Sequence, residues 1–206
     1  DYKGTVPCSA LVFDSTAGYP GMNDDSQIVV EDGKFKSDVA AVTVIKQTSD
    51  AGNRVKVSGG TFSSDVSAYV AEGYVQNNGT VEQLGETNAV AKVGNIYYKT
   101  LAEAVSAADN NTVTLLKNTV EDVVIPAGKI VTLDLNGKKL TVPSDCGIDV
   151  RGKDSTLTIT GNGEITCNKT PICVSEGAVV IENGTINSDT DYCTYAKNGG
   201  TITVNG

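Results

Sequence analysis

The sequence contains no histidine and no tryptophan, and its five cysteines include no C-x-x-C pair. Imidazoles and closely spaced thiolates are the common ligands of zinc and related metals, so these absences exclude the usual metal sites. We therefore expect neither a bound metal nor another cofactor.

Basic residues and long apolar runs are also scarce. The net charge is −9, and Arg54 and Arg151 are the only arginines. A surface that binds nucleic acid or an anionic membrane needs clustered Lys and Arg, so the composition disfavours both partners. The lack of a run of about 18 apolar residues disfavours membrane insertion. The first residues lack a basic segment followed by an apolar one, so we expect no signal peptide in this chain.

The residues that are abundant are Gly, Thr, Val, Asn, Ser and Asp. This mixture favours short strands and many turns over helices. An acidic, threonine-rich composition is also typical of secreted bacterial proteins. We therefore expect an all-β protein.

A repeat recurs along the chain with a period of roughly 22 to 27 residues, which is typical of a solenoid. Each copy has an apolar-x-apolar strand, a turn containing Gly, and a second strand with an apolar anchor. The complete copies are Ile28-x-Val30 with Phe35, Val55-x-Val57 with Phe62, Leu133-x-Leu135 with Leu140, Leu157-x-Ile159 with Ile165, and Val179-x-Ile181 with Ile186.

A weaker third strand follows the anchor in several copies, as at residues 147–150 and 171–174. Three short strands per turn predict a parallel β-helix. In this fold, strands of successive turns pair in register about 4.8 Å apart, and alternate side chains point inward. The leucine-rich consensus of the other common solenoid of this period is missing.

One helix is predicted, near residues 100–109. Thr100 and Glu103 form a capping box, and the apolar residues that follow have the i, i+3, i+4, i+7 spacing of a helix. These residues are Leu101, Ala104, Val105 and Ala108. Residues 86–99 are predicted to be a linker with a short hairpin that turns at Gly94-Asn95. A helix in this place would cover the open core at the start of a solenoid.

The chain is thus predicted to hold two half-modules. Residues 1–85 are interpreted as the C-terminal turns and cap of one β-helix. Residues 86–206 are interpreted as the hairpin-and-helix N-terminal cap and first turns of a second.

Two stretches resemble a known family: residues 57–74 (VSGGTFSSDVSAYVAEGY), and residues 96–105 (IYYKTLAEAV) followed by 112–116 (TVTLL). They are similar to the end and start of pectin-lyase-like β-helix modules in large surface proteins of gut Firmicutes. The resemblance implies a right-handed parallel β-helix in a secreted or wall-attached protein, usually without catalysis. The order of the two half-modules differs from that family.

Four cysteines precede apolar-x-apolar strands by a similar distance. They are Cys8, Cys146, Cys173 and Cys193, whereas Cys167 lies outside this pattern. One interpretation is a stacked ladder of small buried residues. The other is one or two disulfides between adjacent turns.

The first and last copies of the repeat are incomplete. Gly4-Thr5-Val6 contains only the part after the turn, and residues 202–206 stop at the turn. This predicts a chain that assembles head to tail with itself into a filament, completing the repeat in trans. The predicted interface consists of Gly4, Thr5, Val6, Cys8, Leu11 and Phe13 on one side and Cys193, Thr201, Ile202 and Val204 on the other. The alternatives are a fragment of a larger adhesin and closure within one chain.

No catalytic residues are predicted, and we expect the protein not to be an enzyme. Charged residues such as Asp149 with Arg151, or Asp189 with Asp191, do not recur on adjacent turns as a lyase or a paired-carboxylate glycosidase requires. Binding of host or microbial glycans is an alternative role, through Tyr19, Tyr69, Tyr192 or Tyr195. Ice binding is disfavoured because Thr-x-Thr motifs, as in residues 156–160, do not continue regularly in the sequence.

Overall fold

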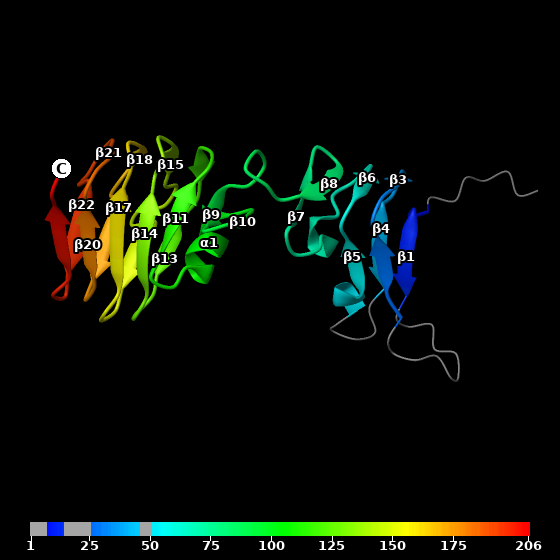
Figure 1. The fold of residues 1–206 in the computed structure, drawn as a ribbon, viewed down its shortest axis with the longest axis horizontal. Helices are drawn as coiled ribbons and strands as arrows, with labels where there is room; N and C mark the ends of the chain where they lie inside the picture. The colour runs from blue at the N-terminus through cyan, green and yellow to red at the C-terminus, as the bar shows by residue number, and fades with distance from the viewer. Residues whose placement is uncertain (1–7, 15–25, 46–50) are drawn as a thin grey trace, which may run out of the picture. The chain divides into compact units, whose positions relative to one another are not determined.

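The computed structural model describes residues 8–14, 26–45 and 51–206. The chain divides into two compact units, Asp1–Leu84 (unit 1) and Gly85–Gly206 (unit 2). Both units consist of stacked parallel coils, about seven in all, with one short α-helix in the described part of the chain (Figure 1). The predicted all-β parallel solenoid is confirmed.

Unit 2 has three parallel sheets, one for each strand position of the coil. The first-position strands are β11 (Asn111–Leu115), β14 (Ile130–Asp134), β17 (Thr156–Thr160), β20 (Ala178–Ile181) and β23 (Thr201–Val204). The second-position strands are β12 (Thr119–Val120), β15 (Lys139–Thr141), β18 (Glu164–Cys167) and β21 (Thr185–Ser188). The third-position strands are β13 (Val123–Ile125), β16 (Ile148–Arg151), β19 (Ile172–Ser175) and β22 (Thr194–Lys197).

Inward residues of successive coils form apolar columns, and one predicted alignment is wrong. The sequence pattern aligned Leu135 with Ile159, but Leu133 is the residue that pairs with Ile159. A shift of two residues keeps the same face of a strand inward, so the apolar pattern cannot distinguish the two registers. Leu135 lies beyond the end of β14 and is also fully buried, where it fills the corner of the coil. The anchors are in the predicted register, with Leu140 opposite Ile165 and Ile165 opposite Ile186.

An antiparallel hairpin and a helix close the N-terminal end of unit 2. Strands β9 (Ala91–Val93) and β10 (Ile96–Tyr98) form the hairpin around the predicted Gly94-Asn95 turn, and β9 pairs antiparallel with β11. Helix α1 (Leu101–Ala107) buries Leu101, Ala104 and Val105 in the core of the unit. The predicted hairpin and helical cap are confirmed.

The N-terminus of α1 uses two different caps. As predicted, the Thr100 hydroxyl accepts a hydrogen bond from the Glu103 N–H, at 3.1 Å. Glu103 does not complete the capping box but forms an ion pair with Lys99, at 3.6 Å. The carboxylate of Glu121, from the next segment of the chain, instead accepts hydrogen bonds from the N–H groups of Leu101 and Ala102. It therefore satisfies two of the donors that a helix start leaves unpaired.

Unit 1 repeats the same three strand positions over fewer coils. The parallel pairs are β2 (Ile28–Val30) with β5 (Val55–Val57), β3 (Lys34–Phe35) with β6 (Gly60–Phe62), and β1 (Leu11–Asp14) with β4 (Val42–Ile45). The predicted anchors Phe35 and Phe62 are in register, and their stacked rings have centroids 5.0 Å apart. Short 3-10 turns lie at Ala51–Arg54 and Ser67–Tyr69.

A second antiparallel hairpin closes the C-terminal end of unit 1. Strands β7 (Tyr74–Asn77) and β8 (Thr80–Gln83) turn at Asn78-Gly79, and β8 pairs antiparallel with β6. Both turn residues have positive φ, of 48° and 81°, which suits an Asn-Gly hairpin turn. Because β8 runs against β6, it ends the parallel stacking on that side of the unit.

The cap by Glu121 provides a test of stability. We expect Glu121→Ala to lower the free energy of unfolding by about 1–3 kcal/mol, because it leaves the buried Leu101 N–H without its acceptor. The matched control is Glu103→Ala, which removes only an exposed ion pair worth about 0.3–0.5 kcal/mol. Urea denaturation followed by circular dichroism measures both variants. Equal destabilisation by the two changes would contradict the assigned cap.

Candidate assembly interface

Unit 2 has an open end formed by β21, β22 and β23. Within the described ranges, each of these strands pairs only with the strand of the preceding coil. Their inward residues Ile186, Thr194 and Ile202 are half-buried, whereas the residues opposite them one coil earlier are buried. These buried partners are Ile165, Ile172 and Val179. Figure 1 shows β22 and β23 at the last coil, beside the C-terminus. We call this surface the C-terminal open end.

Unit 1 has a matching open end formed by β1, β2 and β3. In the part of the chain that the structure describes, each of these strands also pairs on one side only. Their inward residues Leu11, Ile28 and Phe35 are half-buried, and the partners opposite them are buried. These partners are Val42, Val55 and Phe62. We call this surface the N-terminal open end.

The outer strands of both ends direct backbone groups away from their own coil. The N–H groups of Thr201 and Asn205 donate to the preceding coil, to Gly177 O at 3.0 Å and Ile181 O at 2.9 Å. Because successive N–H groups alternate in direction along a strand, the N–H groups of Ile202 and Val204 point outward. On β1, the Leu11 N–H donates to Ala41 O at 2.9 Å, so the Val12 N–H points outward in the same way. Both ends thus offer edges for strand addition.

The predicted interface residues that the structure describes lie at these two ends. Gly4, Thr5 and Val6 lie outside the described residues. Leu11 is half-buried and Phe13 is buried in the hydrophobic core of unit 1. Cys8 is exposed and lies just before β1. On the other side, Cys193 and Thr201 are exposed, Ile202 is half-buried, and Val204 is 64% exposed.

The predicted interface lacks the edge residues of the other strand positions. Ile186 and Thr194 contribute to the C-terminal open end, and Ile28 and Phe35 contribute to the N-terminal one. The signal that could have identified them is their place in the outermost copies of the repeat, where an inward residue has a neighbour on only one side.

The cysteines do not form a single ladder. Cys146 and Cys173 form a disulfide between consecutive coils, with a Cα–Cα distance of 5.0 Å, as in the second interpretation. Cys173 pairs in register with Asp149 and Tyr195 rather than with a cysteine. Cys8, Cys146 and Cys193 lie before third-position strands, whereas Cys173 lies within β19, so the four residues do not share one register position. Cys8, Cys167 and Cys193 are free thiols, and only Cys167 is buried.

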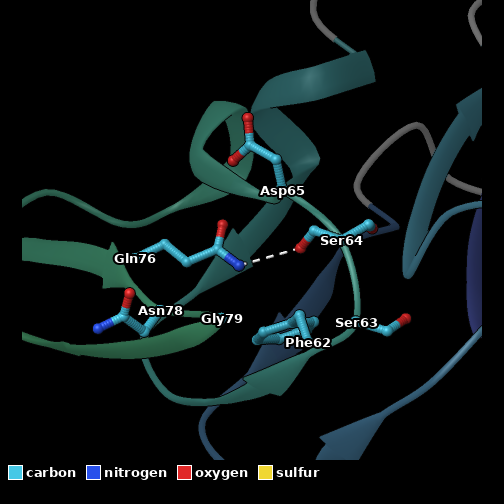
Figure 2. Close-up of a pocket in the computed structure, with 7 residues that line it drawn as sticks. All are labelled: Phe62, Ser63, Ser64, Asp65, Gln76, Asn78 and Gly79. Atoms are coloured by element: carbon cyan, nitrogen blue, oxygen red, sulfur yellow. Dashed lines mark hydrogen bonds between the residues drawn. The ribbon is translucent and has the colours of Figure 1, made fainter.

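A surface hollow in unit 1 lies beside the β7–β8 turn (Figure 2). It is lined by Phe62, Ser63, Ser64, Asp65, Gln76, Asn78 and Gly79. The Gln76 amide donates to Ser64 O at 3.0 Å and accepts from the Val66 N–H at 2.7 Å. Hydrogen bonds from the hydroxyl and N–H of Ser67 lower the pKa of the Asp65 carboxyl. These polar groups hold the loop between β6 and β7 in place, which is a structural role.

The residues of the alternative functions are dispersed. Tyr192 and Tyr195 are exposed near β22, Tyr69 packs against the core of unit 1, and Tyr19 lies outside the described residues. The Arg151 guanidinium pairs with Asp149 on the outer face of β16. No group of three candidate metal ligands and no helix able to cross a membrane occurs in the described ranges.

Threonines align on the outer face of the first-position sheet more regularly than the sequence indicated. Thr112, Thr132 and Thr158 occupy one register column, which continues through Val180 to Thr203. The irregular period concealed this alignment, because coil corners of different length separate equivalent strand positions. Val180 interrupts the column of hydroxyl groups.

Comparisons with family models, curated proteins and solved structures found no match to this chain.

The disulfide between coils provides a second test of stability. Its two cysteines are separated by 27 residues, and closing a loop of this length in the unfolded chain is worth about 3.5 kcal/mol. We expect Cys146→Ser with Cys173→Ser to lower the free energy of unfolding by about that amount. Cys193→Ser, at an exposed free thiol, is the matched control. Equal stability of the double variant and the parent chain, under non-reducing conditions, would contradict this bond.

Proposed function

We propose that this chain is a non-enzymatic extracellular β-solenoid module that assembles head to tail with itself into a filament. The observation that carries the proposal is the match between its two open ends. Each open end consists of the edge strands of three sheets. At each end, at least two of these strands carry a half-buried apolar residue that points inward.

The three strand positions of the two ends correspond one to one. In a head-to-tail junction, β23 of one subunit pairs with β2 of the next and β22 pairs with β1, while one further second-position strand separates β21 from β3. Stacking in this order buries Ile202 against Ile28, and both residues are half-buried in the single chain. Burial of apolar surface contributes roughly 25 cal/mol per Å² of association free energy before the entropy of association is subtracted.

The repeat pattern also predicts that one coil at the junction is built from strands of both subunits. β23 occupies the first strand position, and β1 of the next subunit occupies the third. The predicted Gly4-Thr5-Val6 segment would supply the second. The contact joins two different surfaces, and its repetition in the direction in which the coils stack gives a filament rather than a closed dimer.

A secreted or cell-surface location is part of the proposal. The disulfide between Cys146 and Cys173 supports it, since such bonds persist mainly in oxidising compartments. The resemblance to right-handed, pectin-lyase-like modules of bacterial surface proteins agrees with this location. Such a module could serve as a structural fibre or as part of a larger adhesin.

Glycan binding is a second candidate, favoured by the aromatic side chains near β22. Tyr192 and Tyr195 are 67% and 47% exposed. Exposed tyrosine rings can stack on sugar faces while the hydroxyl group forms hydrogen bonds. A glycan-array screen of the chain and of a Tyr192→Ala, Tyr195→Ala variant tests this role separately from assembly.

The assembly proposal is tested on the 206-residue chain by light scattering and negative-stain microscopy over a concentration series. We expect filaments that lengthen with concentration. Val204→Pro should abolish them, because proline removes an N–H that points outward and its ring obstructs an approaching strand, while the bonds to β20 stay intact. Val12→Pro should do the same at the opposite end.

The matched controls are Val204→Ala and Val12→Ala, which keep the backbone donors and should still form filaments. Circular dichroism verifies that all four variants are folded. Monomers at every concentration of the parent chain would refute the proposal, and so would filaments that persist in both proline variants.

A further inference from the structure

Two exposed free thiols lie at corresponding places on the two open ends. Cys193 directly precedes β22, and Cys8 lies shortly before β1. Both strands occupy the third position of the coil. In the junction described above, β22 of one subunit and β1 of the next become neighbours in one sheet.

We propose that Cys193 of one subunit and Cys8 of the next form a disulfide that covalently locks the head-to-tail junction. This inference rests on the proposed assembly and adds to it a redox-dependent bond at a named position. It also selects one register for the junction among those that keep the apolar residues inward.

The disulfide inside unit 2 is the structural precedent. Cys146 and Cys173 bridge the third strand positions of two consecutive coils, with Cα atoms 5.0 Å apart. The register partner of Cys173 is Asp149, which follows Cys146 by three residues. The bond thus joins a corner residue of one coil to a strand residue of the next, three residues apart in register.

The junction needs a smaller offset. Thr194 and Leu11 are the first inward residues of β22 and β1, and both are half-buried. Pairing them places Cys193 opposite Ala10, two residues from Cys8. The neighbouring strands of a sheet are about 4.8 Å apart, which lies within the Cα–Cα range of disulfides. A shift of two residues keeps the same faces of both strands inward and places Cys193 directly opposite Cys8, at this spacing, so this is the register that the bond selects.

The bond requires an oxidant, for which we name a low-molecular-weight disulfide such as oxidised glutathione. The thiolate of one cysteine attacks this disulfide, forming a mixed disulfide and releasing one small thiol. The second cysteine then attacks the protein sulfur of the mixed disulfide and releases the other small thiol. The two cysteines lose two electrons and two protons in total, and these reduce the small disulfide to two thiols.

The chain contains an internal control for this chemistry. Cys167 is also a free thiol, but it is buried. Its sulfur lies 3.4 Å from the backbone oxygen of Ser144 and 3.3 Å from the backbone nitrogen of Lys169. Burial denies it access to another subunit, so it should not take part in crosslinking between chains.

The experiment treats the whole chain with oxidised glutathione and separates the products by non-reducing electrophoresis. We expect a ladder of dimers, trimers and larger species, with the Cys8–Cys193 peptide identified by mass spectrometry. Cys8→Ser alone and Cys193→Ser alone should each lose the ladder, and Cys167→Ser should keep it. An equimolar mixture of Cys8→Ser and Cys193→Ser chains should yield dimers and nothing larger, because each chain then carries only one of the two thiols.

Three results would overturn the inference. One is crosslinked dimers formed by either single variant alone, which would show pairing of identical cysteines. Another is a Cys8–Cys193 bond within single chains. The third is filament formation by the parent chain without any covalent ladder. The double variant Cys8→Ser, Cys193→Ser separates this inference from the proposed function, because any filaments that it forms are held by non-covalent contacts alone. If this variant forms no filaments and the parent chain gives no ladder, the proposed assembly itself is refuted.

Discussion

In-register pairing of parallel strands between successive coils is the constraint on which this structure depends. It stacks equivalent inward residues into columns, such as Leu140, Ile165 and Ile186, so each coil buries its apolar residues only against its neighbours. The same pairing satisfies the backbone groups of each strand from two sides. Stability is therefore distributed along the stack, and every coil depends on the presence of the next.

Because of this dependence, the first and last coils of a stack leave apolar residues and backbone groups without a neighbouring coil unless another element covers them. The chain closes two ends with antiparallel hairpins, β7–β8 on β6 and β9–β10 on β11, because an antiparallel strand cannot continue the coil. Helix α1, held by Thr100 and Glu121, adds a lid over the core of unit 2. The other two ends show no comparable device in the described residues and leave inward side chains half-buried. Our functional proposal follows from this contrast between closed and open ends.

The corners of the coils vary in length, and this variation accounts for several of the structural details. A corner residue such as Leu135 contributes to the core without belonging to a strand. Corners also set the cysteines at different register positions, so that one pair forms a bond between coils while Cys8 and Cys193 stay free and exposed. The strands pair in a regular register, whereas the lengths of the corners determine which corner side chains of neighbouring coils come into contact.

The sequence by itself determined the fold class, the hairpin at Gly94-Asn95, the helix that begins after Thr100, and the register of the anchors Phe35 and Phe62. These features are encoded locally, by periodicity of two, turn residues and a helix cap. Only the tertiary structure decided the pairing of Leu133 with Ile159, the helix cap by Glu121, the disulfide between Cys146 and Cys173, and the edge positions of Ile186 and Thr194. Each of these depends on which residues of different coils lie opposite one another. Shifts of two residues preserve the inward face, so the sequence pattern leaves this register undetermined.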